Sequence, residues 1–423
     1  MTGGPVVRRL ANGVRVICDP MPGLETLALS VVIGRGARHE TKAESGWAHL
    51  LEHMVFKAAG DRSARDIVEA IEAEGGHINA ATGHDRTSFQ VRALKGGLPL
   101  AAAVVSDLIF RPALNAADLA KEKRVIAQEI AEAADVPDDL VFELAQAKAF
   151  AGQPLGRPVL GTTASVAAAD AGALAVFRAR LYAPDAIVVS AAGAVEEADV
   201  VELAERWFGA APPVQLAEEL APTRFTGGLS PKARKLEQAH LVFMLPAPGL
   251  TDPDYFAFRL LTEMLGGGMS SRLFQAVREE RGLCYAIDAF ADDRSDGGVL
   301  GVYAGTAAED AEEAACVAAE QIRALIGEVG ADELARAKAQ LKGALFMARE
   351  SAMARAEQNA GQLLVYERLL TTHEIAKGID GVKAADIGRV GKRLLAPCKV
   401  AGSVLGPRRA LAAAEAFERA LFA

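Results

Sequence analysis

The chain has 423 residues, of which 51% are hydrophobic and 24% charged, and its net charge is −9. This composition excludes a disordered chain, and the length predicts two to three domains with a sizeable core. Because no basic stripe occurs, we expect no nucleic-acid partner. The N-terminal residues contain no apolar signal segment, and no apolar run reaches the roughly 18 residues of a membrane span, so we expect a cytoplasmic protein without a membrane anchor.

The first half of the chain reads as alternating strands and helices. Asn12-Gly13 is a tight-turn signal and predicts a hairpin. Ser45 is the expected N-cap of a helix that reaches Lys57, and Gly75 ends a helix that begins at Ser63. The other expected elements are strands over 6–10, 14–18, 26–33, 77–94 with a break near Gly83, and 185–195, and helices over 98–110 and 116–134.

The second half repeats this order of elements. Ser63-Ala-Arg65 matches Ser270-Ser-Arg272 at an offset of 207 residues, and the same offset places Gly75 on Gly282. An internal duplication is the simplest explanation. The expected elements of the second half are strands over 239–245, 283–290, 299–305 and 399–405, and helices over 254–265 and 270–280.

The stretch 211–232 is rich in Pro and Gly and is the expected linker. It divides the chain into a first domain over residues 1–212 and a second over residues 232–423. Hairpins and irregular alternation of helices and strands predict an α+β fold. We expect two similar domains, each with a mostly antiparallel sheet that helices cover on one face.

The segment His49-Leu-Leu-Glu-His53 is the reverse of the HExxH zinc signature. Residues four apart share one face of a helix, so His49 and His53 can reach one metal ion. Glu52 projects from the same face and can accept a proton from a water molecule held there. The motif lies among apolar residues, which indicates a buried helix, where an unused set of His and Glu side chains would be costly.

A catalytic zinc site needs a third protein ligand and an open position. The spacing of residues leaves several donors open, and these are His77, His84, Asp85, Glu122, Glu129 and Glu132. The duplication provides an internal control, because the second half carries none of the proposed metal groups. At offsets of 207 and 215 residues, His49, Glu52, His53, Glu122 and Glu129 fall on Phe256, Arg259, Leu260, Ala337 and Ala344.

Over nearly its whole length the chain resembles the pitrilysin/insulinase family of metallopeptidases, which includes mitochondrial processing peptidase and small bacterial relatives. Four segments carry the resemblance, and these are 49–53, 75–82, 121–130 and 271–285. The resemblance implies a fold that forms half of a clamshell, and Zn²⁺ as the metal. It also implies that Glu129, 76 positions beyond His53, is the third zinc ligand and that Glu122 supports the site without binding zinc.

The resemblance also implies substrate-binding residues. The edge strand Asn79-Ala80-Ala81-Thr82 would pair with the substrate backbone, and Arg278 and Tyr285 of the second domain would hold the substrate carbonyl. The chain departs from the family where it has Ala81 in place of an aromatic residue and His84-Asp85 in place of an Arg-Glu pair. Gly266-Gly-Gly268 matches either a short form of a family glycine-rich loop or a helix C-cap.

These residues predict a zinc endopeptidase in which Glu52 is the general base and Tyr285 and Arg278 assist. Long family members carry four such modules, so a chain with two implies a dimer around a chamber for extended peptides. Both a homodimer and a heterodimer with a related subunit fit this expectation. Two alternatives are a non-catalytic binding or assembly subunit of a peptidase heterodimer and a regulatory zinc site without hydrolysis.

Overall fold

The computed structural model describes residues 4–213 and 220–423, which form two compact units. The first unit falls within residues 1–131, 158–220 and 347–369, and the second within 132–157, 221–346 and 370–423. Each unit therefore contains a segment from the other half of the sequence. The expected division into residues 1–212 and 232–423 follows the repeat in the sequence. The compact units differ from it, because residues 347–369 of the second half belong to the first unit and residues 132–157 of the first half belong to the second.

The first unit is built on a six-stranded sheet in the order β1-β2-β8-β3-β7-β6. Only β2 and β8 pair in parallel, and the other neighbours are antiparallel. The hairpin at Asn12-Gly13 forms as expected, with Gly13 at φ +100°. The strands are β1 (Val6–Arg9), β2 (Arg15–Pro20), β3 (Thr26–Ile33), β6 (His77–Thr82), β7 (Thr87–Leu94) and β8 (Ile187–Gly193), and a separate two-stranded ribbon is formed by β4 (Ala58–Ala59) and β5 (Arg62–Ser63).

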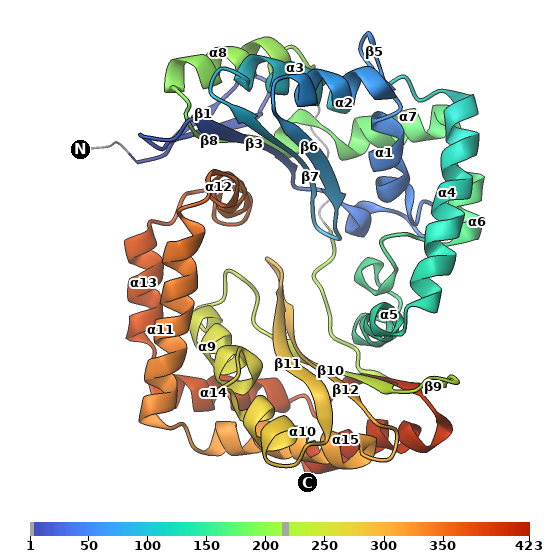
Figure 1. Ribbon diagram of the computed structural model, residues 1–423, viewed down its shortest axis with the longest axis vertical. Helices are drawn as coiled ribbons and strands as arrows, with labels where there is room; N and C mark the ends of the chain where they lie inside the picture. The colour runs from blue at the N-terminus through green and yellow to red at the C-terminus, as the bar shows by residue number, and fades with distance from the viewer. Residues whose placement is uncertain (1–3, 214–219) are drawn as a thin grey trace. The chain divides into compact units, whose positions relative to one another are not determined.

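Helices cover both faces of this sheet, whereas the sequence predicted cover on one face. The helices α2, α3 and α8 lie on one side and α12 on the other (Figure 1). Ile17, Val32 and Val188 face Ala360 and Leu363 of α12, which explains why β8 is buried along its whole length. The helices of this unit are α1 (Trp47–Val55), α2 (Ala64–Ala73), α3 (Leu98–Phe110), α4 (Ala116–Asp135, of which 132–135 belong to the second unit), α6 (Thr163–Ala168), α7 (Ala171–Leu181), α8 (Glu197–Phe208) and α12 (Ala352–Tyr366).

The second unit has the same plan, which confirms the α+β fold with two similar halves. Its sheet order is β11-β12-β10-β13-β9, with one parallel pair, β13 and β9. This order matches β6-β7-β3-β8-β2 strand for strand. The strands are β9 (Gly228–Ala233), β10 (Ala239–Ala247), β11 (Cys284–Asp293), β12 (Gly298–Thr306) and β13 (Ala401–Gly406).

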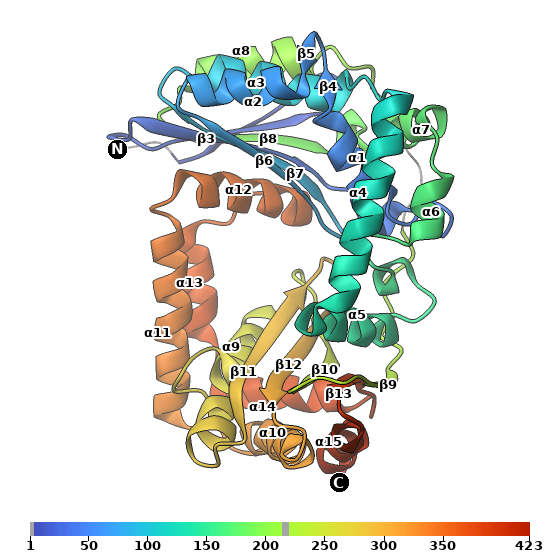
Figure 2. The ribbon, with the colours of Figure 1, turned by 45° about the vertical axis from the view of Figure 1, so that its right-hand side comes forward.

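Here too an exchanged helix covers one face of the sheet. Helix α5 lies on one side, and α10, α14 and α15 lie on the other (Figure 2). Leu140, Val141 and Ala145 of α5 pack against Val242 and Met244 of the central strand. The helices of this unit are α5 (Pro137–Ala149), α9 (Tyr255–Gly266), a π-helix η4 (Phe274–Glu279), α10 (Ala311–Gly327), α11 (Ala331–Ala348, of which 347–348 belong to the first unit), α13 (Thr372–Gly381), α14 (Ala384–Leu395) and α15 (Ala413–Phe422). Short 3₁₀ turns complete the two units.

Two local expectations need correction. Residues 228–232 of the expected linker are part of β9, which takes the place in the second sheet that β2 has in the first. Residues 214–219 of that linker lie outside the described residues. The expected helix over 270–280 contains a π-helix. No helix in the described ranges is long and apolar enough to cross a membrane.

Candidate metal centre

Helix α1 presents His49, Glu52 and His53 on one face and buries the opposite face. Leu50, Leu51 and Val55 are fully buried in the core of the first unit. The side chains of His49 and His53 are 15% and 20% exposed, so both lie at the border between the core and the surface. The spacing of the motif therefore works as expected, because three polar residues at i, i+3 and i+4 share one face.

The start of α1 is held by a residue that the sequence analysis missed. Ser45 is not the N-cap; that position is Gly46, at φ +88°, where a Cβ atom would lie 2.5 Å from the carbonyl oxygen of Leu160. The buried carboxylate of Glu40 accepts hydrogen bonds from the backbone N–H groups of Gly46 and Ala48, at 2.9 and 2.8 Å. A carboxylate at a helix N-terminus satisfies free N–H groups and favours the helix dipole. No capping pattern in the sequence indicated this role of Glu40, because Glu40 lies six residues before the N-cap residue Gly46.

The third donor comes from α4. Glu129 Oε2 lies 4.0 Å from His49 Nε2 and 3.7 Å from His53 Nε2. One ligand atom from each of these three residues lies within 4.8 Å of the other two, and within the described residues this is the only group of three or more such donors. Of the six candidates that the sequence left open, the structure brings Glu129 to the two histidines.

These distances suit an ion better than direct hydrogen bonds. Ligands around a tetrahedral zinc ion lie about 3.4 Å apart, given metal–ligand distances of about 2.1 Å. Glu129 Oε2 is buried and has no hydrogen-bond partner among the residues described. Burial lowers the pKa of His49 to about 4, and the neighbouring His53 adds to this effect, so the ring is neutral and can bind a cation. The donor set therefore fits a divalent metal ion.

Glu122 lies beside the histidines on the same helix, two turns before Glu129. Its buried carboxylate lies 3.1 Å from His53 Nδ1 and 2.9 Å from Lys57 Nζ. A carboxylate that accepts the Nδ1–H of a histidine leaves the lone pair of Nε2 free for a metal. The resemblance implied that Glu122 supports the site without binding zinc. Nothing in the sequence indicated that Lys57 would form an ion pair with Glu122.

Glu52 faces the edge strand of the sheet. The hydroxyl of Thr82, the last residue of β6, donates a hydrogen bond to Glu52 Oε2 at 2.5 Å. Burial raises the pKa of Glu52, and the hydrogen bond from Thr82 opposes this shift. Asn79, Ala80 and Ala81 precede Thr82 on the outermost strand of the sheet, and their exposure alternates along it.

The four other candidate donors have different surroundings. His77 is exposed at the start of β6, and Glu132 is exposed and falls in the second unit. Asp85 forms an ion pair with the buried Arg38 at 3.1 Å, and the carbonyl oxygen of His84 accepts from the backbone N–H of Arg38. The His84-Asp85 pair, where the chain departs from the family pattern, therefore anchors the turn between β6 and β7.

Arg278 and Tyr285 lie together in the second unit. The guanidinium carbon of Arg278 is 4.9 Å from the centroid of the Tyr285 ring, and the Tyr285 side chain is 78% exposed. Gly266 ends α9, and Gly267 is its C-cap. A Cβ atom at Gly266 would lie 2.1 Å from the backbone nitrogen of Ala289, so this glycine allows α9 to approach β11 closely.

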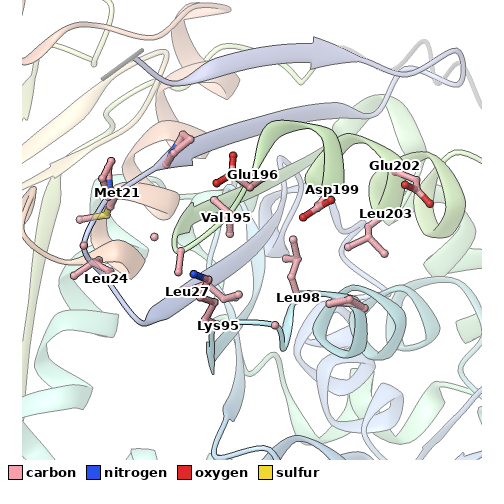
Figure 3. A pocket seen from close by; sticks show the side chains of 17 residues that line it. Met21, Leu24, Leu27, Lys95, Leu98, Val195, Glu196, Asp199, Glu202 and Leu203 are labelled. Atoms are coloured by element: carbon pink, nitrogen blue, oxygen red, sulfur yellow. The ribbon is translucent and has the colours of Figure 1, made fainter. Parts of the chain in front are cut away.

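The first unit also contains a cavity of about 590 Å³ that is separate from the histidines (Figure 3). It lies where β2, β3 and β8 meet the starts of α3 and α8. Its lining combines apolar side chains such as Leu27 and Leu98 with the exposed carboxylates of Asp199 and Glu202. None of the metal donors lines it.

The fold and the site define a class of protein with two similar sheet-containing units and a His, His, Glu metal site in one of them. The family model "Insulinase (Peptidase family M16)" matches residues 15–163, which hold all the donors, and the model "Peptidase M16 inactive domain" matches residues 169–341. The chain belongs to the insulinase (M16) family of peptidases, which confirms the resemblance found in the sequence.

Relatives and solved structures agree with this assignment. A protein of Rickettsia bellii described as an uncharacterized zinc protease is 34% identical over 95% of this chain and 97% of its own, and the similarly described YmxG of Bacillus subtilis is 31% identical over 90% and 94%. A protease from Helicobacter pylori has the same fold, with a TM-score of 0.88 at 20% identity over 96% of this chain and 100% of its own. A Pseudomonas fluorescens structure described as a peptidase M16 inactive domain matches with a TM-score of 0.86 at 19% identity over 96% and 98%.

Proposed function

We propose that this protein is a zinc-dependent endopeptidase that cleaves peptides or unfolded segments bound in an extended form. The observation that carries the proposal is the convergence of His49, His53 and Glu129, with Glu52 next to them on α1. When bound, zinc supplies a Lewis acid that polarises a substrate carbonyl and acidifies water. The relatives described as zinc proteases support zinc as the metal.

Glu52 is the proposed general base. It lies one residue before His53 on the polar face of α1, and its carboxylate accepts from Thr82. It would take a proton from the attacking water and return it to the leaving amine. Thr82 orients the carboxylate, while Glu122 keeps the proton of His53 on Nδ1.

The edge strand β6 is the proposed docking site for the substrate backbone. β6 is the last strand in the order of the six-stranded sheet, so no other strand of that sheet pairs with its outer edge. The strand ends at Thr82, whose hydroxyl donates a hydrogen bond to Glu52. A peptide that adds to this edge forms main-chain hydrogen bonds, and these allow many side-chain sequences. Arg278 and Tyr285 would hold the substrate carbonyl, with donors suited to a developing negative charge.

A dimer that encloses a chamber, formed with a second copy or with a related subunit, is the proposed assembly. The chain has two of the repeated units, and only the first contains the metal donors. An active monomer, shown by light scattering of the sample that is assayed, would contradict the chamber.

The Glu52→Gln variant tests the proposed function. Gln keeps the shape of the side chain but cannot accept the proton, so kcat on a quenched generic peptide should fall about 10²–10⁴-fold. Zinc content, measured by mass spectrometry, should stay at the wild-type level. A zinc-loaded variant that cleaves as fast as wild type would overturn the role of Glu52. A wild-type protein that binds zinc but never cleaves would favour a binding or regulatory subunit.

A further inference from the structure

The guanidinium group of Arg278 lies between two aromatic rings in the second unit. Its central carbon is 4.6 Å from the centroid of Phe274 and 4.9 Å from that of Tyr285. Both distances fall within the range of a cation–π contact. The three side chains form a stack, which we call the Phe–Arg–Tyr stack.

The backbone of this region brings the three side chains together. Phe274 and Arg278 belong to the π-helix η4, a form that is rare and is frequently found at functional sites. The chain then turns at Gly282, at φ +65°, whose N–H donates to the carbonyl oxygen of Arg278. The N–H of Leu283 donates to the carbonyl oxygen of Val277, and this tight turn leads into β11, which carries Tyr285.

The opposite side of this segment is anchored in the core. Leu273 and Val277 are fully buried, and Leu283 is nearly so. The hydroxyl of Thr306 on β12 donates to the carbonyl oxygen of Leu283 at 2.5 Å. The backbone under the stack is therefore held firmly, while Tyr285 is 78% exposed. An exposed ring on a fixed backbone keeps one orientation only if another group supports it.

Arg278 contacts the Tyr285 ring, and Phe274 in turn contacts Arg278. The side chain of Phe274 is partly exposed, and among the described residues it is not part of the hydrophobic core of the second unit. Its ring contacts the guanidinium group of Arg278. We propose that Phe274 is a positioning residue that holds Arg278 against Tyr285 so that both side chains face the substrate. This inference rests on the proposed peptidase function and adds to it a residue that no resemblance identified.

The experiment compares three variants of the full-length, zinc-loaded protein. Phe274→Leu removes the ring and keeps an apolar side chain, and Phe274→Tyr keeps the ring. Phe256→Leu is the control, because Phe256 is also a partly buried phenylalanine of the second unit but packs against its hydrophobic core. Each protein is labelled with 3-fluorotyrosine, so the ¹⁹F spectra of the wild type, Phe274→Leu and Phe256→Leu contain five tyrosine signals and that of Phe274→Tyr contains six. The signal that is missing from labelled Tyr285→Phe identifies Tyr285.

Phe274→Leu should lower kcat by about ten- to a hundredfold with little change in KM, because misplaced groups lose stabilisation of the transition state. The ¹⁹F signal of Tyr285 should shift and sharpen, and zinc content should not change. Phe274→Tyr should restore both the rate and the signal. Phe256→Leu should leave the Tyr285 signal in place.

The two measurements separate the possible failures. If Phe274→Leu leaves the Tyr285 signal unchanged, the stack does not position this ring and the inference is wrong. If the signal moves but an active enzyme keeps its rate, the positioning role is also wrong. If the wild-type protein has no peptidase activity while the signal moves as expected, the proposed function fails and with it the catalytic purpose of the stack.

Discussion

Helices α1 and α9 occupy equivalent positions in the two repeats, since each follows the central strand of its sheet and precedes the outer hairpin. In α1, the positions i, i+3 and i+4 are His49, Glu52 and His53. In α9, the matching positions are apolar except for Arg259, which forms an ion pair with Asp293 of β11 at 2.7 Å. The same scaffold thus carries a group of candidate metal donors in one unit and an ion pair at the equivalent helix in the other, so the fold alone does not imply chemistry.

The same contrast applies to the exchanged helices. Helix α5 packs on the second sheet through apolar side chains such as Leu140 and Val141. Helix α12 packs on the first sheet through apolar contacts and also through a buried charge, because Asp19 of β2 accepts hydrogen bonds from Arg355 and Asn359. Polar anchoring fixes the register of α12 in a way that apolar contact alone does not.

The largest expected effect concerns the proposed metal site, whose donors lie, within the described residues, in the first unit only. Glu129→Ala removes the donor that closes the site, so zinc should be lost and peptide cleavage should fall by about 10³-fold or more. Glu132→Ala, three residues further along α4, is the control and should behave as wild type. Zinc analysis and peptide turnover measure both, and a zinc-loaded, active Glu129→Ala protein would refute the proposed ligand set.

Arg355→Met tests the polar anchor of α12. Asp19 is 1% exposed, so removal of its partner leaves a buried charge, and we expect a loss of about 3–5 kcal/mol in the free energy of unfolding. The exposed pair of Arg65 and Glu69 is the control, and Arg65→Met should cost no more than about 0.5 kcal/mol. Urea unfolding measures both, and equal costs would show that α12 is held by apolar contact alone.

Glu122→Gln separates support of the metal from its ligation. The variant keeps an acceptor for His53 Nδ1–H but loses the negative charge, so zinc affinity should fall about 10–100-fold while the loaded enzyme still cleaves. Competition with a chelator measures the affinity. A variant that loses zinc as completely as Glu129→Ala would make Glu122 a ligand.

The smallest expected effect lies in the second unit. Arg259→Met leaves Asp293 with only the Tyr255 hydroxyl at 3.4 Å, and the free energy of unfolding should fall by about 1–3 kcal/mol. Zinc content should not change, because the proposed donors His49, His53 and Glu129 all belong to the first unit. A loss of zinc in this variant would mean that the two helices are not independent in function.

Local sequence was enough for several parts of the molecule. The hairpin at Asn12-Gly13, the break near Gly83 and the repeated order of strands could be predicted because turn residues and periodicity act over a few residues. The pairing of His49 with His53 could be predicted for the same reason, since one helical turn sets it. The N-cap at Ser45 was wrong, because Glu40 reaches the helix start from outside the usual capping positions.

The sequence by itself determined that two similar α+β halves exist and that a single helix in the first carries the His, Glu and His side chains. The spacing of residues left six donors open, and only the tertiary structure shows that Glu129 lies beside the two histidines, that α5 and α12 are exchanged, and that Phe274 lies on Arg278. The physical reason is the separation along the chain over which each effect acts. Helical and strand periodicity are local properties of the backbone, whereas the approach of Glu129 to His53 depends on how distant helices pack.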